Sequence, residues 1–448
     1  MMAAHLTRPR VGCALHGALY AASAIDGVTP LVHATPGCGV QAALWHGVGC
    51  GLGNGWPTSN LSEKHVVFGG ASRLREQIKN TRSVVAGELT VVLTGCPAEM
   101  IGDDVEAMAQ EARDAGGDVV DLPTAGFLGS AYRGFAAFLQ AVLEKSVPAA
   151  PRRAGLVNIF GPLPHQDGSW LAEIEELSRL IAGIGLTPNP IFGPFGGLGS
   201  LRASAQAALS VTVSPWTAAA VRTLDDRFGI PWIESAGLPV GAAATAAWLE
   251  TIVAASVDID ERAATAFIDH ERRREAYCLD RVLEPLYRQG GPRAFALALP
   301  SLHAAGLARF LVQTLGWSAA AIVITDNPDN DSRVALQNGL TAVHFTEDDN
   351  EIAGLIGASG ADIVFGSALE QMAAERLEAP LIECAAPTSR LGLTTGFGGF
   401  RGGLALLEAI LSAADTNAAS VADLSKPAAG TSVQPRWPQR IRLSETAS

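Results

Sequence analysis

The chain has 448 residues, of which 48% are hydrophobic and 17% charged, and its formal net charge is −13. This composition contains no basic footprint for DNA or RNA, and no apolar run reaches the ~18 residues of a transmembrane helix. Six cysteines do not make a disulfide framework in a chain of this length. We therefore expect a cytoplasmic protein with reduced thiols, and segment 1–10 lacks the pattern of a secretory signal.

Strand-like apolar runs alternate with helical patterns through most of the chain, which indicates parallel α/β sheets. The predicted boundaries give α/β units at 1–150, 151–290 and 291–413, followed by an extended tail at 414–448. Periodicity is lost near Pro148, and glycine and proline break the pattern at 290–292. Ligands are expected at the loops that follow the carboxyl ends of the strands.

The elements are predicted from apolar periodicity and its interruptions. In the first unit, strands are predicted at 30–34, 89–94 and 119–122, with a helix over 103–115 that has Asp103 as its N-cap. The second unit is predicted to contain strands at 154–160 and 209–213 and helices at 170–184, 217–228 and 260–288. For the third unit the pattern predicts helices at 302–315 and 402–413, and strands at 294–298, 320–325, 341–345, 362–365 and 380–384.

Three cysteines lie beside glycine at predicted element boundaries: Cys13, Cys38 and Cys96. Thiolate is the form of cysteine that binds iron, and cysteine ligands dominate iron–sulfur clusters. Glycine beside a ligand lets the backbone come close to a bulky cluster. Because these cysteines are widely spaced within α/β structure, they indicate one shared inorganic site rather than a zinc ribbon.

The other cysteines have less specific surroundings. Cysteine is among the most buried residue types, so Cys278, in the long helix, and Cys384, at the end of a buried strand, are interpreted as core residues. Cys50 lies in a glycine-rich loop and its role stays open.

Other polar groups near the cysteines have structural interpretations. The histidines at 33, 46 and 65 are interpreted as hydrogen-bonded structural residues, and the pair Asp103-Asp104 as a helix cap rather than a metal site. There is no Walker loop, and the run Gly51-Leu52-Gly53 follows no convincing strand. We therefore predict neither ATP hydrolysis by this chain nor a dinucleotide site.

A further motif runs from Cys96 to Asp104 with the sequence C-P-A-E-M-I-G-D-D. Together with the three cysteines this motif, the most specific of all, resembles the nitrogenase component 1 superfamily. Segments 30–38 and 61–70 also carry the resemblance, which continues more weakly through 214–216, 238–241 and 394–397. The resemblance covers the chain to about residue 413 and implies three Rossmann-like α/β domains in each of two paired chains, α and β.

The resemblance implies that Cys13, Cys38 and Cys96 hold half of a P-cluster-type [8Fe-7S] iron–sulfur cluster, shared with a homologous α subunit in an α₂β₂ assembly. An ATP-hydrolysing iron protein would deliver electrons, which this oxidoreductase subunit would relay. The family's α chain holds its catalytic cofactor with a cysteine and a histidine. This chain has no cysteine near Ser214-Pro215-Trp216 and no histidine after His344, so the catalytic cluster is expected in the partner.

Two departures from nitrogenase β chains narrow the expected function. Gly126 precedes the motif Phe127-Leu128-Gly129-Ser130, where nitrogenase β chains have a serine able to ligate the oxidised cluster. Only twelve residues precede Cys13, so the long N-terminal arm of those chains is not expected. Both departures favour a nitrogenase-like reductase, and the compact β chain with three cysteines is most similar to methylthio-alkane reductase.

Such a reductase would cleave C–S bonds of small methylthio compounds. Two alternatives stay open from the same resemblance: a subunit of a scaffold on which the nitrogenase cofactor is assembled, and a subunit of a dark-operative protochlorophyllide-type reductase. The scaffold belongs to a different functional class, because it has no turnover of its own, and an α/β binding protein with core cysteines is the last alternative.

Overall fold

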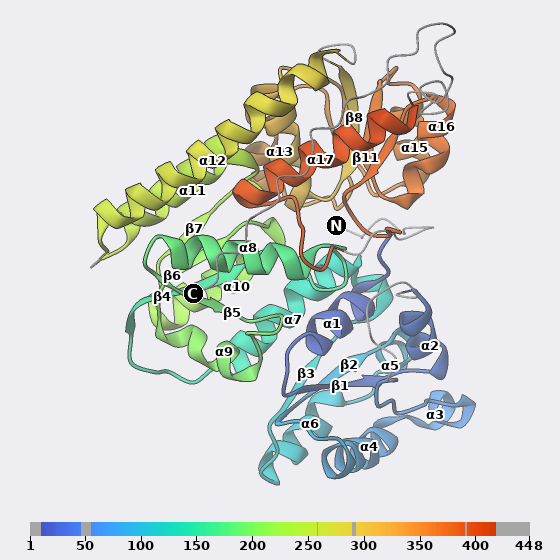
Figure 1. The fold of residues 1–448 in the computed structure, drawn as a ribbon. Helices are drawn as coiled ribbons and strands as arrows, with labels where there is room; N and C mark the ends of the chain where they lie inside the picture. Colours follow the sequence, from blue (N-terminus) through green and yellow to red (C-terminus); the bar gives the residue numbers. More distant parts are fainter. Residues whose placement is uncertain (1–9, 46–54, 258, 289–292, 390–391, 418–448) are drawn as a thin grey trace, which may run out of the picture.

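The computed structural model describes residues 10–45, 55–257, 259–288, 293–389 and 392–417. Within these ranges the strands form three sheets with the orders β1-β2-β3, β5-β4-β6-β7 and β10-β9-β8-β11-β12. Every pairing between these strands is parallel. The sheets follow one another along the chain as three α/β units (Figure 1), which confirms the predicted fold class.

The first unit contains β1 (Val28–His33), β2 (Leu89–Thr94) and β3 (Val119–Leu122). Every residue of β2 is buried, as expected for the central strand of a covered parallel sheet. The helices of this unit are α1 (Ala14–Ser23), α2 (Pro36–Trp45), α3 (Glu63–Phe68), α4 (Ala71–Val84), α5 (Cys96–Ile101), α6 (Val105–Asp114) and α7 (Ala131–Lys145), with the 3-10 helix η1 (Gly126–Leu128).

Glycines allow α1 and α7 to pack unusually closely. A Cβ at Gly17 would lie 1.7 Å from the carbonyl oxygen of Ala131, and one at Gly134 would lie 1.8 Å from that of Ala14. No side chain fits at either position, so the two helices approach backbone to backbone. This contact brings the start of α1, where Cys13 lies, beside the start of α7.

The second unit contains β4 (Arg153–Phe160), β5 (Thr187–Pro190), β6 (Ala207–Thr212) and β7 (Trp232–Glu234). The two outer strands were not predicted from the sequence: β5 reads Thr-Pro-Asn-Pro, and β7 has three residues. Proline is tolerated in β5 because an edge strand has no second neighbour on one side. The helices are α8 (Trp170–Gly183), α9 (Leu198–Ala203), α10 (Ala218–Phe228), α11 (Gly241–Ala255) and α12 (Glu261–Arg288), with 3-10 helices η2 (Ser204–Gln206) and η3 (Pro215–Thr217).

The third unit has a five-stranded sheet of β8 (Ala294–Leu299), β9 (Ser318–Ile324), β10 (Val343–Phe345), β11 (Ile363–Gly366) and β12 (Leu381–Glu383). The predicted helix 302–315 is a shorter α-helix that continues as a π turn, and the predicted helix 402–413 is longer than expected. The helices are α13 (Ser301–Arg309) with the π turn η4 (Phe310–Thr314), α14 (Asn330–Gln337), α15 (Asp349–Gly357), η5 (Ala368–Glu370), α16 (Gln371–Arg376) and α17 (Gly399–Asn417).

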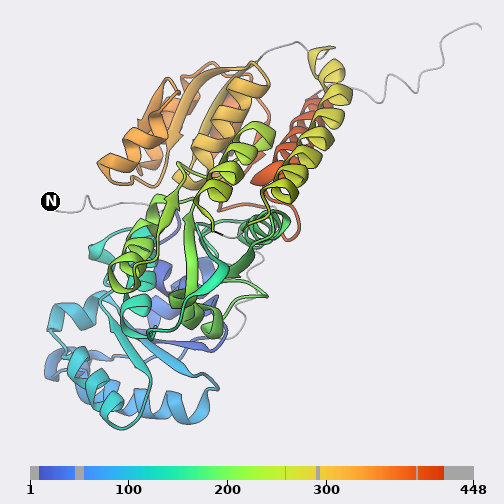
Figure 2. The same cartoon turned by 90° about the vertical axis from the view of Figure 1, so that its left-hand side faces the viewer.

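The first two units share one hydrophobic core, whereas most of the third unit is packed around clusters of its own. One cluster of buried side chains runs from α1 and α7 into the second sheet and its helices. Within it, the ring centroids of Phe135 in α7 and Phe192 lie 5.9 Å apart. The third sheet has its own clusters on its two faces. Helices α11, α12 and α17 lie side by side along the upper part of the molecule (Figure 2).

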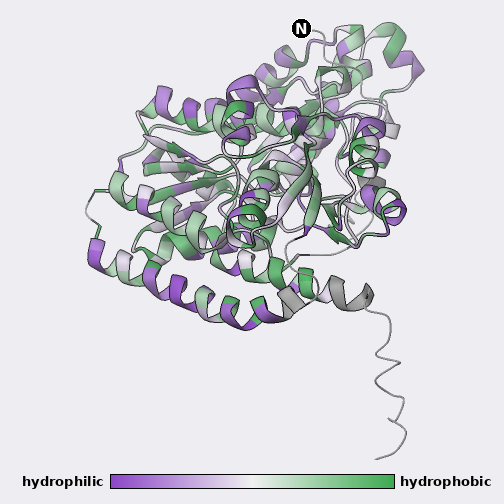
Figure 3. Cartoon of the chain, turned by 90° about the horizontal axis from the view of Figure 1, so that it is seen from above, coloured by the Kyte–Doolittle hydropathy of each residue, from purple (hydrophilic) through white to green (hydrophobic). Residues whose placement is uncertain are grey.

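Hydrophilic residues lie mainly on the outer helices, and the interior of the units is predominantly hydrophobic (Figure 3). Among the described residues no helix combines the length and the apolarity needed to cross a membrane.

Candidate functional site

The three cysteines singled out in the sequence lie at the ends of elements in the first unit. Cys13 is the N-cap of α1, Cys38 lies in the first turn of α2, and Cys96 is the first residue of α5. Helices α2 and α5 follow β1 and β2, which pair in parallel so that His33 lies opposite Thr94. The carboxyl ends of adjacent parallel strands therefore place Cys38 and Cys96 at the same edge of the sheet.

Distances from two glycines show that the cysteines converge. A Cβ at Gly126 would lie 3.2 Å from Cys96 Sγ and 3.4 Å from Cys13 Sγ, and one at Gly95 would lie 3.6 Å from Cys38 Sγ. Burial raises the pKa of the Cys13 thiol, and the nearby Cys96 acts in the same direction. Burial also raises the pKa of the Cys38 thiol, with further contributions from Cys13 and Cys96. The structure thus brings all three thiols together.

The three thiols do not form a ligand set for a single metal ion. Within the described ranges, no three His, Cys, Asp or Glu side chains lie close enough to hold a single metal ion. Three half-buried sulfurs arranged around glycine backbone suit a larger group than one ion.

Cys13 is held by backbone pairing and by a histidine. It forms an isolated antiparallel bridge with Ser130, while Ala14 N–H donates to Gly129 O at 2.9 Å. Cys13 N–H also donates to His16 Nδ1 at 3.1 Å, and this nitrogen lies 3.5 Å from Cys13 Sγ. Gly12 has φ +92° and approaches His16 so closely that a Cβ would lie 2.5 Å from Nδ1. These contacts fix the backbone that carries Cys13.

Sequence reasoning missed His16. Burial lowers the pKa of His16 to about 4, so its ring is neutral near pH 7 and Nδ1 is free to accept the Cys13 N–H. The signal was available, because the histidine follows the cysteine by three residues at the start of a helix. Such a pair resembles a capping box, in which the third helical residue reaches back to the N-cap.

Cys96 is contacted by Gly126, the first residue of η1, which follows a loop after β3. Gly126 N–H donates to Cys96 Sγ at 3.1 Å. The loop is fixed to the end of β2 because Thr124 N–H donates to Thr94 Oγ1 at 3.0 Å and Thr124 Oγ1 donates to Thr94 O at 2.8 Å. Gly126 therefore supplies a hydrogen bond to one sulfur and leaves open the space that a side chain would fill.

Comparison with known families covers most of the chain. The family model described as "Nitrogenase component 1 type Oxidoreductase" matches residues 13–415. The chain belongs to this family. The match begins at Cys13 and includes all three cysteines.

Relatives of this nitrogenase component 1 type chain include molybdenum-iron protein beta chains. The nitrogenase molybdenum-iron protein beta chain of Sinorhizobium fredii is 27% identical over 189 residues, which are 41% of this chain and 36% of that protein. That of Clostridium pasteurianum is 25% identical over 260 residues, 53% of this chain and 56% of that protein. The matched segments therefore span between 36% and 56% of these relatives.

Solved structures show the same fold over nearly the whole chain. The structure titled "Nitrogenase Cp1 at pH 6.5" has a TM-score of 0.79 at 20% identity and covers 92% of this chain and 94% of that one. "Nitrogenase Cp1 at pH 5" has a TM-score of 0.71 at 15% identity, with 92% and 91% covered. At these identities the likeness concerns the fold.

His33 and the two aspartates of the nitrogenase component 1 motif connect the strands to neighbouring loops. His33 is buried, with Nδ1 2.9 Å from Ser59 Oγ and Nε2 3.0 Å from Asp103 Oδ2. Asp103 also accepts the Gly70 N–H at 2.7 Å. The structural interpretation of His33 is confirmed, but Asp103 as N-cap is wrong, since Asp104 caps α6 by accepting the Ala107 N–H at 3.0 Å.

The structure places the remaining sequence-predicted groups elsewhere. His65 accepts the Ser62 N–H at 3.0 Å within the turn that begins α3. Cys50, His46 and the run Gly51-Leu52-Gly53 lie outside the described residues. Cys278 lies in α12, and Cys384 is buried directly after β12, so both belong to elements remote in sequence from the first unit.

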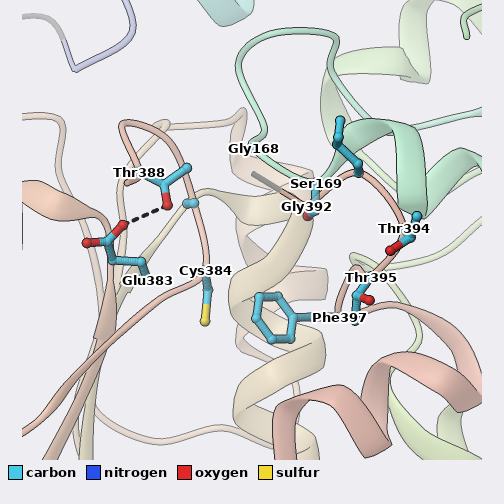
Figure 4. A pocket seen from close by; sticks show the side chains of 11 residues that line it. Gly168, Ser169, Glu383, Cys384, Thr388, Gly392, Thr394, Thr395 and Phe397 are labelled. Atoms are coloured by element: carbon cyan, nitrogen blue, oxygen red, sulfur yellow. Dashed lines mark hydrogen bonds between the residues drawn. The ribbon is translucent and has the colours of Figure 1, made fainter. Parts of the chain in front are cut away.

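Cys384 forms part of the wall of a pocket of about 410 Å³ (Figure 4). Ser169, Thr388, Thr394 and Thr395 contribute hydroxyl groups to this pocket, and Phe397 contributes an aromatic face. Glu383 accepts hydrogen bonds from Thr388 Oγ1 at 2.7 Å and from Ser389 N–H at 2.6 Å. The carboxylate is thus bound by its own loop, and the pocket has none of the three grouped thiols.

Proposed function

We propose that the chain is the β-type subunit of a nitrogenase-like reductase and that Cys13, Cys38 and Cys96 hold one side of a P-cluster-type [8Fe-7S] cluster. The observation that carries this proposal is the convergence of three thiols, from three separate elements, around Gly126 and Gly95. Cysteine thiolates are the usual protein ligands of iron–sulfur clusters.

The residues present fit such a cluster. All three thiols are half-buried, and glycine backbone leaves room between them. Burial of Cys13 and Cys38 disfavours their charged form, and bound iron would offset this by supplying positive charge beside each thiolate. The cluster, when bound, would store and release electrons. The protein's part is to hold the sulfurs, exclude water and direct N–H groups toward them.

Two hydrogen bonds would act on the bound sulfurs. The Gly126 N–H that donates to Cys96 Sγ stabilises negative charge on that atom. The neutral His16 ring orients the Cys13 backbone because its Nδ1 accepts the Cys13 N–H. Hydrogen bonds to cluster sulfurs and solvent exposure set reduction potentials, so both residues would influence electron relay.

Exposed apolar side chains on α2, α3, α5 and η1, in the same unit as the cysteines, support a covering partner. Phe68 at the end of α3 is 87% exposed and Met100 on α5 is 77% exposed, and large parts of Val40, Phe127 and Leu128 are also exposed. Large exposed apolar side chains grouped near a site mark protein–protein contact surfaces. We propose that a homologous α subunit, which carries the catalytic cluster, covers this face in an α₂β₂ assembly, with an ATP-hydrolysing iron protein as electron donor.

The proposed reaction is reductive cleavage of a small methylthio-alkane. Two electrons and two protons convert R–S–CH₃ into the hydrocarbon R–H and methanethiol, so that one C–S bond breaks while one C–H and one S–H bond form. Gly126 supports a reductase distinct from dinitrogen-fixing enzymes, because no serine hydroxyl stands at this position. Substrate choice would belong to the α subunit.

The test is co-expression with the α subunit, followed by iron analysis, EPR and an assay with iron protein and ATP. We expect eight irons per αβ pair at this site and release of methanethiol with the hydrocarbon. A four-iron cluster would favour a protochlorophyllide-type reductase, and transfer of a metal cofactor to another protein without turnover would favour an assembly scaffold. Either result would contradict the proposed reaction.

A further inference from the structure

Arg10, three residues before Cys13, is buried, and its hydrogen-bonded and ion-pair partners lie in the third unit. Its side chain is 7% exposed and its guanidinium forms an ion pair with Glu370 through Nη2. Nε lies 3.5 Å from Asp349 Oδ1, and Nη2 lies 3.4 Å from Ser367 Oγ. Asp349 is the first residue of α15, and Glu370 ends η5. One arginine thus connects the segment before Cys13 to two elements of the third unit.

The carboxylate of Glu370, which forms the ion pair with Arg10, is itself held by hydrogen bonds. Glu370 Oε2 accepts the Ser367 N–H at 2.7 Å and the Ser367 Oγ–H at 2.8 Å, and the side chain is 3% exposed. Removing one partner of a buried ion pair of this kind strongly destabilises the folded protein, because the other charge stays buried and uncompensated. The position of the Arg10 side chain is therefore fixed by residues of the third unit.

The tether between Arg10 and Cys13 is short. Three residues of fully extended chain span at most about 10 Å, so fixing Arg10 confines the position of Cys13. On its other side Cys13 is bridged to Ser130 of the first unit, and Ala131 N–H donates to Gly12 O at 3.2 Å. Segment 10–13 is consequently held at both ends, by the third unit and by the start of α7.

We propose that Arg10 is a positioning residue for Cys13, which fixes the place and the solvent access of this thiol by fastening segment 10–13 to Glu370 and Asp349. The proposal rests on the proposed function where it treats Cys13 as a cluster ligand. Arg10 would act through segment 10–13 and not as a ligand, since its hydrogen-bonded and ion-pair partners are Ser367, Glu370 and Asp349. The third unit thereby contributes to a site whose cysteines all lie in the first unit.

The first test measures thiol alkylation in the full-length chain without cluster. Iodoacetamide labelling, resolved by peptide mass spectrometry, gives separate rates for Cys13, Cys38 and Cys96. In Arg10→Ala we expect labelling of Cys13 to accelerate about tenfold relative to Cys96, because local opening of a segment exposes its own thiol first. Arg10→Lys, which keeps one charge opposite Glu370, should restore most of the protection.

Arg75→Ala is the matched control, because it removes an arginine ion pair to Glu111 on the exposed surface of the first unit. The control should leave the ratio of the rates unchanged. If Arg10→Ala does not fold, Glu370→Gln removes the same ion pair while keeping a polar side chain of similar size. An unchanged ratio in both variants, or equal acceleration at all three cysteines, would overturn the positioning role.

The second test uses the loaded complex with the α subunit and reads the EPR spectrum and iron content. Arg10→Ala should alter the line shape of the cluster signal and shift its reduction potential, with Arg10→Lys close to the wild type. Cys13→Ala separates the two proposals. If it keeps all its iron, the cluster assignment fails, whereas unchanged Cys13 labelling in Arg10→Ala alongside iron loss in Cys13→Ala rejects only the positioning role.

Discussion

Two groups of chemically active side chains lie beyond the carboxyl ends of parallel strands, and they are built in opposite ways. The thiol site of Cys13, Cys38 and Cys96 is half-buried, surrounded by glycine and bordered by exposed apolar residues. The second group, here named the polar junction, lies where the second and third units meet and consists of four buried ionisable residues: Asp167, Glu173, His303 and Asp326.

In the polar junction the chain's own groups partner part of the charge, while His303 Nδ1, Asp167 Oδ2 and Asp326 Oδ1 accept or donate no hydrogen bond among the described residues. Glu173 accepts the N–H groups of Phe397 at 2.6 Å and Gly398 at 2.9 Å. His303 Nε2 lies 3.2 Å from Asp167 Oδ1. Asp326 accepts the Trp216 indole N–H at 2.7 Å. These contacts resemble those of structural buried charges, which are kept by hydrogen bonds and opposite charges.

The difference explains why one group is a candidate site and the other is not. The resemblance places the cofactor cysteine of the α chain near Trp216. The rings of Trp216 and Tyr132 stack with their centroids 5.5 Å apart, and the Trp216 indole N–H donates to Asp326. Side chains therefore fill the space at this position. At the thiol site, by contrast, glycines leave space beside the sulfurs. We expect changes at the thiol site to affect iron, and changes at the polar junction to affect stability.

The largest expected effect comes from removing a thiol. Cys13→Ala, Cys38→Ala and Cys96→Ala should each abolish the cluster EPR signal and electron delivery, because alanine offers no ligand for iron. Iron content of the purified αβ complex is the measurement. Cys278→Ala and Cys384→Ala are the controls and should retain full iron, so loss of iron in Cys384→Ala with retention in Cys96→Ala would reverse the assignment.

A bulky residue at Gly126 should also lower iron content. A Cβ there meets Cys96 Sγ at 3.2 Å and Cys13 Sγ at 3.4 Å, closer than ordinary contact, and the branches of valine extend farther. Gly126→Val should reduce bound iron to less than about half, and Gly126→Ala should have a smaller effect. Gly354→Val, at a position where a Cβ meets no atom within 4 Å, is the control. Full iron in Gly126→Val would show that the sulfurs do not require this space.

The polar junction should make stability depend on pH. Burial raises the pKa of Glu173 from its ordinary 4.5 to about 7. Between these values the folded chain keeps a proton that the unfolded chain releases, so the free energy of unfolding falls as pH rises from 4.5 to 7. Over the whole of this pH range the free energy of unfolding falls by about 3 kcal/mol.

Glu173→Gln should flatten this slope in urea unfolding measured across that pH range. Glu175→Gln, on the exposed face of the same helix, is the matched control and should keep the wild-type slope. Equal slopes in wild type and Glu173→Gln would contradict the assignment of the pH effect to Glu173.

The smallest effect is expected at Trp216. Trp216→Phe removes the indole donor to Asp326 and should lower the free energy of unfolding by about 2 kcal/mol, since hydrogen bonds to charged groups contribute about 1.5–3 kcal/mol. Urea unfolding measures this, with Trp232→Phe in the edge strand β7 as the control. Iron content should stay at the wild-type level, and a loss of iron would mean that the two regions are not separate.

Patterns local in the sequence predicted most of the fold. Strand β2 was predicted with its observed bounds because its six residues are an uninterrupted apolar and β-branched run between polar segments. Strand β5 could not be predicted, because two prolines in four residues contradict strand propensity and only its edge position permits them.

The candidate site was predicted in part. Glycine neighbours identified the three cysteines, but their convergence depends on the backbone contact at Gly17 and Gly134, which no single-residue pattern contains. His16 was overlooked although its spacing from Cys13 is local. The Arg10–Glu370 pair joins residues 360 positions apart, so it could be found only in the folded chain.

The most direct measurement is a crystallographic map of the αβ complex recorded at the iron absorption edge. The account predicts one compact group of iron atoms bonded to the sulfurs of Cys13, Cys38 and Cys96 and closed on its other side by the α subunit. Anomalous density elsewhere, with these three sulfurs in contact only with carbon and backbone atoms, would contradict it.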